Sequence, residues 1–445
     1  MIDEAGSFIN PSGFIFTIVM GISMLFLPRR FVFVPIIATA CFITLGQRLV
    51  IAGLDFTMIR ILVLFGWTRV IIRKEIFSIK FNKIDRAIIW FVIINIFFNT
   101  LLWRTSDAFI NRLGFAFNAI GIYFLFRFLI RDINDISRLF KILSLVAVIL
   151  AIIMLIEKST GHNLFAVFGG VPEITAIRDG KLRCQGPFAH PILAGTFGAT
   201  LMPLLFSLWW QKNGKILAFL GVIACSIITI TSHSSGPVMA YIFGIIGLSM
   251  WPFRNNMRTI KWGIFFTIII LHFIIMKAPV WFLIGKLGHI IGGTGWHRSE
   301  LIDSTIRHFN EWWLFGTKYT RHWLPTGVSW SPDHTDITNM FIRQGVDGGL
   351  VTMILFIIII VRCFQGLGRA IQNVEYSSLT VKIILWSMGV ALFAHVVSFF
   401  SVSYFDQMIL FWYLLLAMIS SIELVKLNNA DSTKTSIYSN SKICA

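Results

Sequence analysis

The chain has 445 residues, of which 56% are hydrophobic and only 13% are charged, and its mean hydropathy is +0.78. Because soluble domains carry about 25% charged residues, this composition excludes an ordinary soluble enzyme. Lysine and arginine outnumber aspartate and glutamate by 38 to 21, a formal net charge of +17. Such charge can serve nucleic-acid binding, but in so apolar a chain it favours a membrane protein with basic connectors and no nucleic-acid partner.

Long apolar segments recur between Gly13 and Leu424. They predict an all-α polytopic membrane protein in the lipid bilayer, because only a helix satisfies its own backbone in lipid. In chain order we predict thirteen spans, near residues 12–27, 31–46, 57–72, 86–103, 112–130, 140–156, 190–210, 215–231, 237–253, 261–276, 348–362, 381–400 and 407–424. Twelve spans are the alternative, since only residues 27–30 join the first two.

The spans divide the chain into six parts: helices in 1–156, a loop 157–189, helices in 190–276, a large loop 277–347, helices in 348–424 and a polar tail 425–445. One set of alternate connectors, with the tail, holds 22 Lys and Arg; the other set holds 14, of which 11 lie in the two long loops. Because cytoplasmic connectors carry the excess, we expect a cytoplasmic tail and external long loops. The basic residues of the long loops then indicate an anionic ligand at the outer membrane face.

The first long loop ends in the stretch 180–191, directly before a predicted span. Gly186 and Pro187 predict a turn at the membrane surface, which would hold Arg183 near the depth of the lipid headgroups. A guanidinium at this depth suits bidentate binding of phosphate oxygens. Arg183 is therefore a candidate phosphate ligand, and the alternative is a simple headgroup anchor.

The second long loop, 277–347, is too long for an ordinary connector, and such loops are usually functional or disordered. Its composition argues against disorder, since it holds five of the ten histidines and six of the fifteen tryptophans. Indole faces stack on sugar rings and also favour the membrane interface. We weigh the two roles equally, with Trp296 and Trp330 as candidate sugar contacts.

Within this loop, residues 299–313 predict an amphipathic helix on the membrane surface, with Gly316 as its stop. Its apolar residues recur at helical spacing: Ile302, Ile306, Phe309 and Trp313. Arg298 falls at the start of this helix, where the helix dipole and the free N–H groups also favour an anion.

His334, Asp336 and Asn339 follow closely at the mouth of the next predicted span. A histidine near a reacting hydroxyl can act as a general base or bind the substrate, and the alternative for His334 is a structural hydrogen bond. Asp333, His334 and Asp336 could also ligate a metal, but no second ligand pair is spaced to complete a site. We therefore expect no metal and no cofactor.

The order of these motifs resembles the O-antigen ligase and O-antigen polymerase superfamily of bacterial inner-membrane proteins. The resemblance covers most of the chain but is specific mainly between residues 180 and 360. Its motifs are the stretch 183–193, the Ser232-His233-Ser234-Ser235-Gly236 turn, Gly295-Trp296-His297-Arg298, the Trp-Trp-Leu-Phe-Gly sequence at 312–316, the segment 334–339 and the segment 344–350.

The resemblance implies a fold similar to the GT-C membrane glycosyltransferases and a metal-independent, inverting glycosyl transfer. The donor would be an undecaprenyl-pyrophosphate-linked oligosaccharide, and other polysaccharide assembly and export proteins would be partners. By motif position, Arg183 and Arg298 look like the arginines that bind the pyrophosphate, and His334 looks like the histidine near the acceptor.

Two positions depart from the pattern of the superfamily. Many members have Ser-Arg-Gly where this chain has Ser232-His233-Ser234, so one cationic contact is missing here or is carried by His233. The usual His-Asn pair is His334-Thr335, with Asn339 five positions after the histidine, and Asp336 becomes a rival for the catalytic role.

We therefore expect an enzyme that polymerises lipid-linked repeat units for exopolysaccharide or O-antigen at the periplasmic face of the bacterial inner membrane. The alternatives are an O-antigen ligase, which delivers glycan to lipid A-core or another acceptor, and a polysaccharide or small-molecule transporter. A transporter would explain the spans but would leave the tryptophan-rich loop with Arg298 and His334 unused.

Overall fold

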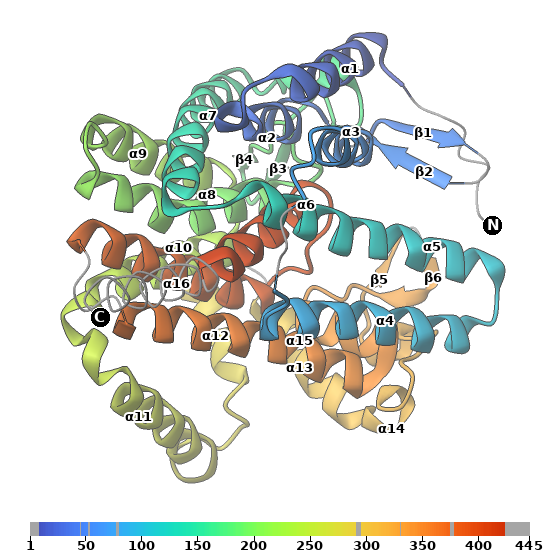
Figure 1. The fold of residues 1–445 in the computed structure, drawn as a ribbon. Helices are drawn as coiled ribbons and strands as arrows, with labels where there is room; N and C mark the ends of the chain where they lie inside the picture. The colour runs from blue at the N-terminus through green and yellow to red at the C-terminus, as the bar shows by residue number, and fades with distance from the viewer. Residues whose placement is uncertain are drawn as a thin grey trace, which may run out of the picture.

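The computed structural model describes residues 9–44, 46–51, 54–76, 80–290, 295–329, 331–373 and 378–422, and it is mostly helical (Figure 1). The first eight helices are α1 (Pro11–Phe26), α2 (Phe33–Phe42), α3 (Met58–Ile72), α4 (Lys83–Trp103), α5 (Ser106–Ala116), α6 (Ile122–Leu129), α7 (Ile133–Thr160) and α8 (Pro191–Phe206). The next eight are α9 (Lys215–Thr231), α10 (Ser235–Ser249), α11 (Met257–Ile270), α12 (Phe282–Ile290), α13 (Gly295–Arg307), α14 (Phe309–Trp312), α15 (Met340–Asn373) and α16 (Leu379–Phe399). A C-terminal helix, Gln407–Ile422, follows.

Each of the thirteen predicted spans coincides with a helical segment, and the differences are in length. Seven helices of the described part are long and apolar enough to cross a membrane, and the chain is a multi-pass membrane protein. They are Lys83–Trp103, Ser106–Leu129, Ile133–Thr160, Pro191–Trp210, Trp251–Ile275, Met340–Gln372 and Leu379–Phe399. Helix α2 has 10 residues, about 15 Å of helix, which is half of a bilayer core.

Local side chains explain where several helices begin. The Asn10 side chain accepts N–H bonds at the start of α1, and Pro11 occupies the first helical position. Asn82 and Asp85 form a reciprocal capping box at α4, and Asp132 caps α7. Helix α7 ends at Gly161, whose φ of 74° is left-handed and suits glycine.

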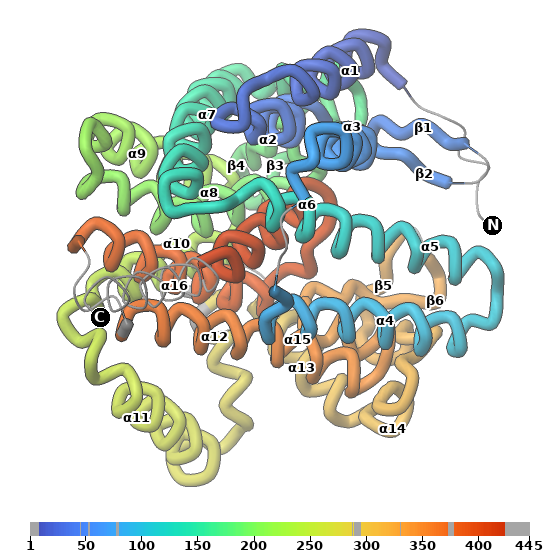
Figure 2. The backbone as a smooth tube through the Cα atoms, in the orientation of Figure 1, coloured from blue at the N-terminus to red at the C-terminus, as the bar shows by residue number. Residues whose placement is uncertain are grey.

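Helix α8 lies at the centre of the helical body, where it packs against α9, α10 and α16. Glycines permit this close approach: a Cβ on Gly195 would lie 2.3 Å from the Ser232 hydroxyl, and one on Gly198 would lie 2.7 Å from the Thr229 hydroxyl. Helix α11 differs from α8, because none of its residues is buried. Figure 2 shows α11 running away from the other helices. Its side chains are thus available to lipid.

The segment 277–347 folds into a small unit with its own core. Helix α12 packs against α13, and a β-hairpin follows, made of β5 (Gly327–Val328) and β6 (Ser331–Thr335). Seven buried side chains form the core of this unit: Leu301, Trp312, Trp323, Leu324, Ile337, Ile342 and Val346. The first turns of α15 complete the unit up to Gly348 and Gly349, where the backbone leaves helical geometry. The predicted span 348–362 begins at this break.

The amphipathic helix predicted at 299–313 differs in its limits. The helix begins at Gly295, and His308 interrupts it between α13 and α14. Its buried face carries Leu301, Ser304 and Thr305. Three of the four predicted apolar residues stay exposed: Ile306, Phe309 and Trp313. They form an unpartnered apolar edge in the described structure, and the placement of this helix on a membrane surface stays a prediction.

Two further hairpins complete the described strands: β1 (Arg48–Ile51) with β2 (Leu54–Thr57), and β3 (Ala176–Arg178) with β4 (Lys181–Arg183). The second of these hairpins lies within the predicted loop 157–189. The predicted tail, 425–445, and Trp330 lie outside the described residues.

Candidate functional site

The short turn between α9 and α10 is the meeting point of the two predicted arginines. The turn contains Ser232, His233, Ser234 and Ser235, and His233 has a positive φ of 42°. Such a φ is uncommon outside glycine. It turns the chain sharply between the two helices and leaves the hydroxyl groups of Ser234 and Ser235 as adjacent hydrogen-bond partners.

Arg183 reaches this turn from the β3–β4 hairpin. Its guanidinium donates to the Ser234 Oγ at 2.9 Å, and the Cys184 N–H donates to the Thr231 carbonyl at 3.0 Å. Asp179 and Gly180, at the hairpin tip, both have positive φ, the geometry of a two-residue hairpin turn.

A side chain of α7 binds the backbone that follows Arg183. The Glu157 carboxylate accepts the N–H groups of Gln185 at 3.1 Å and of Gly186 at 2.9 Å. A buried carboxylate that binds two backbone N–H groups fixes a loop firmly. The turn predicted at Gly186 and Pro187 is therefore present, and it sets the position of Arg183.

Arg298 reaches the same turn from the first turns of α13. Its guanidinium donates to the Ser235 Oγ at 3.3 Å. Arg183 and Arg298, 115 positions apart in the sequence, therefore bind adjacent serines. The fold brings together the two arginines that the sequence selects.

The electrostatic environment of this pair is strongly positive. Burial, with Arg178 as the next cause, lowers the pKa of Arg183 below its ordinary value and that of Arg298 to about 10. Burial and the charges of Arg183 and Arg178 lower the pKa of His190, which precedes the span Pro191–Trp210, to about 4. In the described part of the chain, neither Arg183 nor Arg298 forms an ion pair with a carboxylate, and Arg183 Nε is buried without a hydrogen-bond partner. Such a site favours an anionic ligand.

A cavity of about 1250 Å³ lies near the α9–α10 turn, and neither Arg183 nor Arg298 is among its lining residues. Ser401 links the cavity to Arg298, because Ser401 lines the cavity and also lies close to Gly236. A Cβ on Gly236 would lie 2.3 Å from the Ser401 hydroxyl and 3.5 Å from an Arg298 nitrogen. The walls come from α4, α5, β6, α15, the loop after α16 and the C-terminal helix. His190, His334 and Asp336 are among the lining residues.

His334 is a half-buried side chain on β6. Its Nδ1 lies 2.7 Å from the Ser331 Oγ, which fixes the plane of the ring. Burial, and then the charge of Arg343, lowers the pKa of His334 below its ordinary value of 6.5. The imidazole is therefore neutral at pH 7 and can accept a proton.

Asp336 also lines the cavity and is exposed. Its backbone carbonyl lies 3.0 Å from His297 Nε2, so the segment after β6 is tied to α13. His334 and Asp336 thus face one cavity, and the rivalry between them for the catalytic role stays open.

The other predicted contacts lie in different settings. Asn339 is buried, and its side chain accepts the N–H groups of Phe341 and Ile342 at the start of α15. Trp296 is exposed at the start of α13, and it is not among the residues that line the cavity. His233 lies in the turn with Ser234, where burial and nearby basic groups lower its pKa. Its predicted part in binding is not tested by these contacts.

A second charged cluster, which was not predicted, lies in the cavity wall. The Asp347 carboxylate of α15 accepts hydrogen bonds from Arg343 at 3.1 Å and from Arg112 of α5 at 3.4 Å. Asn99 of α4 donates to the Asp347 carbonyl at 2.7 Å. Arg112 lies inside an apolar predicted span, and an ionisable residue at membrane depth marks a functional region by default. That rule could have selected Arg112.

The site and fold define a multi-pass helical membrane protein in which two arginines bind one interhelical turn near a large cavity. The chain matches no protein-family model, and no curated protein is significantly similar to it.

Proposed function

We propose that this protein polymerises undecaprenyl-pyrophosphate-linked oligosaccharide repeat units in exopolysaccharide or O-antigen biosynthesis. The observation that carries the proposal is a pair of guanidiniums, Arg183 and Arg298, that bind adjacent serines near a cavity of about 1250 Å³ and form no ion pair with a carboxylate in the described part of the chain. A diphosphate is a compact dianion or trianion, and two arginines with fork geometry match its oxygens.

The proposed location is the periplasmic face of a bacterial inner membrane. The excess of basic residues in the short connectors supports this orientation, because such connectors face the cytoplasm. Segments from both long loops meet at the α9–α10 turn, as expected if both loops lie on one side of the membrane. A polyprenyl tail would stay in the bilayer while its pyrophosphate and sugars enter the site from that side.

The arginines would act on the leaving group. Glycosyl transfer develops positive charge on the sugar ring and negative charge on the departing pyrophosphate. Fixed cations in a buried site stabilise that negative charge without reorganisation. Arg183 is held by Ser234, and Arg298 by Ser235, before any substrate arrives. The bond between the anomeric carbon and the phosphate oxygen breaks, and undecaprenyl pyrophosphate departs.

The acceptor hydroxyl would be activated from the opposite side of the sugar. His334 suits this role, because its depressed pKa leaves a neutral imidazole at pH 7. If its Nδ1–H donates to Ser331, the lone pair that takes the proton is at Nε2. Asp336 is the rival base on the same cavity wall. One base opposite the leaving group gives inversion at the anomeric carbon.

The size and lining of the cavity support an oligosaccharide. The exposed Trp103 lines it, and indole faces stack on the apolar faces of sugars. Amide and hydroxyl groups of Asn99, Asn111 and Tyr413 supply polar partners for sugar hydroxyls. A volume of about 1250 Å³ exceeds the upper end of ordinary small-molecule pockets, about 1,000 Å³.

The test is a gel profile of surface glycan and lipid-linked intermediates in a strain that lacks the gene, complemented with wild type, Arg183→Ala, Arg298→Ala or His334→Ala. We expect single repeat units to accumulate in the deletion strain and in each variant, with the variant proteins still present in the membrane. Long lipid-linked chains in the deletion strain would instead indicate a ligase, and unchanged glycan a transporter. Normal chain length in all three variants would refute the site.

A further inference from the structure

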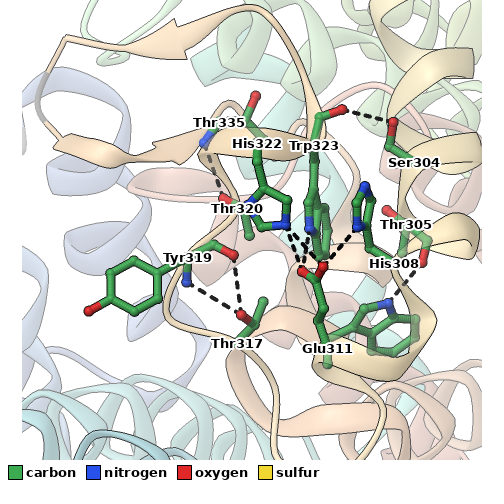
Figure 3. A network of polar contacts seen from close by, with 11 residues as sticks. Ser304, Thr305, His308, Glu311, Thr317, Tyr319, Thr320, His322, Trp323 and Thr335 are labelled. Carbon is green, nitrogen blue, oxygen red and sulfur yellow. Dashed lines mark hydrogen bonds and ion pairs between the residues drawn. The ribbon is translucent and has the colours of Figure 1, made fainter.

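His308, Glu311 and His322 form a cluster in the long segment 277–347, outside the cavity wall (Figure 3). His308 Nδ1 lies 2.8 Å from Glu311 Oε1, and His322 Nε2 lies 3.0 Å and 2.9 Å from the two Glu311 oxygens. All three ligand atoms lie within 4.8 Å of one another. Figure 3 shows one ring nitrogen of each imidazole directed at the Glu311 carboxylate.

We propose that these three side chains bind a divalent transition-metal ion, with Zn²⁺ as the best match. Two imidazoles and one carboxylate are a common zinc ligand set, and a tetrahedral ion places its ligand atoms about 3.3 Å apart. The His–Glu separations of 2.8 to 3.0 Å need to widen by only a few tenths of an ångström, and the two imidazole nitrogens, which lie within 4.8 Å of each other, need to approach by up to about 1.5 Å. The fourth position would hold water, since the side chains are 31%, 36% and 50% exposed.

The surroundings orient the ligands as a metal site requires. The Trp323 indole N–H donates to Glu311 Oε2 at 3.0 Å, and the His308 ring stacks on the Trp323 ring with an interplanar angle of 9°. Such neighbours outside the ligand set fix ring and carboxylate orientation and support metal affinity. Trp323 is itself buried in the small core of this segment, so the side chain that supports the ligands is fixed by packing.

The proposed ion would connect three consecutive pieces of the segment. His308 follows α13, Glu311 lies in α14, and His322 lies in the short helix Arg321–Trp323. The next residues lead to the β5–β6 hairpin, and Thr320 bonds to Asp333 and Thr335 of that hairpin. The described core of this segment has seven buried side chains, and a metal ion that links its pieces would add to its stability. The ion would thereby hold α13, which carries Arg298, against the strand that carries His334.

The inference does not depend on the proposed glycosyl transfer, and its test uses no sugar substrate. The full-length protein, purified in detergent with a tag that contains no histidine run, is stripped of metal and titrated with Zn²⁺ alone. Bound zinc is counted by elemental analysis, and Co²⁺ is used in parallel because its visible absorption reports a nitrogen- and oxygen-ligated tetrahedral site.

The variants are His322→Ala and Glu311→Gln, with His162→Ala as the matched control. His162 and Glu173 form an exposed pair 4.0 Å apart and belong to no group of three metal-binding side chains in the described structure. We expect one Zn²⁺ per chain in wild type and His162→Ala. We expect an affinity loss in the other two beyond the 10- to 100-fold that loss of a supporting contact causes.

Two results would overturn the proposal. One is a wild-type protein that binds no more zinc than His322→Ala, and the other is wild-type affinity in both ligand variants. Gel filtration checks that the variants are folded. Glu311→Gln keeps the size of the side chain and an acceptor for Trp323, so it decides the question if His322→Ala aggregates.

Discussion

Replacement of Arg298 by methionine should separate stability from activity. Burial is the chief cause that lowers the pKa of Arg298 from its ordinary value to about 10. At 1.36 kcal/mol for each pKa unit, the fold holds this charge at a cost of roughly 3 kcal/mol. Because the pKa of Arg298 is lower in the folded state than in the unfolded state, its charge destabilises the folded protein at every pH below about 10, including pH 7.

Methionine keeps an unbranched apolar stem and removes the charge. The variant also loses the hydrogen bond to Ser235, and a bond from a charged donor is worth about 1.5–3 kcal/mol. The net change in the free energy of unfolding is then a gain between about 0 and 2 kcal/mol for the ligand-free protein. Loss of one charge-assisted contact to the pyrophosphate should lower the rate of chain extension roughly 10- to 150-fold.

The assay is thermal unfolding of detergent-purified protein with and without inorganic pyrophosphate. A ligand at 100 times its Kd adds about 2.7 kcal/mol to the stability of a protein that binds it. We expect pyrophosphate to raise the unfolding temperature of wild type clearly more than that of Arg298→Met, since a 10- to 150-fold weaker Kd leaves about 0.3–1.4 kcal/mol of stabilisation at the same concentration. Arg307→Met is the control, because Arg307 lies on the same helix but is exposed and paired with Glu300 and Asp303.

The reasoning fails if Arg298→Met unfolds well below both wild type and Arg307→Met. It also fails if Arg298→Met keeps the full response to pyrophosphate. The first result would show that Arg298 is a structural residue, and the second that the anion binds elsewhere.

Three further predictions concern the cavity and the turn. If His334 is the base, the rate of chain extension should fall only as the pH drops through the depressed pKa of His334, below 6.5. A rate that already falls with decreasing pH above 6.5 would contradict this role. Gly236→Ala should impair extension, because the new Cβ would lie 2.3 Å from a serine hydroxyl, whereas Gly263→Ala meets nothing within 4 Å and should extend normally; equal glycan ladders would count against the packed turn. Asp347→Asn should lower stability by about 1–3 kcal/mol in denaturant unfolding, because it removes the carboxylate from Arg112, whose side chain is 14% exposed, and from Arg343, whose side chain is 42% exposed. The exposed Glu173→Gln should change stability by less than about 1 kcal/mol, and similar losses in both would refute the cluster.

The positions of the helices were predictable because lipid tolerates few backbone structures. Each of the thirteen predicted spans overlaps a helical segment of the described structure, and seven helices there are long and apolar enough to cross a membrane. Lengths were harder to predict. Helix α2 stops after 10 residues, and α15 extends to 34 residues across the break at Gly348 and Gly349. These limits depend on tertiary packing and on local backbone geometry, which hydropathy does not register.

The arginines of the site were predictable one at a time from local patterns, whereas their meeting was expected only from the resemblance, which assigns both to one pyrophosphate. Arg183 lies beside a Gly-Pro turn and Arg298 at a helix start, and both are local patterns. Their contact passes through Ser234 and Ser235, and nothing local marks those hydroxyls as ligands.

Two clusters of polar side chains were not predicted from the sequence. Arg112 and Asp347 are 235 positions apart, and only the packing of α4, α5 and α15 brings them together. His308, Glu311 and His322 lack the paired spacing of known zinc motifs, so their convergence is visible only in the folded segment.

The most direct test of the central claim is chain extension by the purified protein in liposomes. The only substrate supplied is the undecaprenyl-pyrophosphate-linked repeat unit, without nucleotide sugar or other proteins. We predict a ladder of longer lipid-linked glycans, with one undecaprenyl pyrophosphate released for each new bond. The ladder should be lost in an Arg183→Ala, Arg298→Ala double variant and retained in Arg307→Ala. A wild-type protein that forms no new glycosidic bond, or a double variant that extends chains at the wild-type rate, would contradict the account.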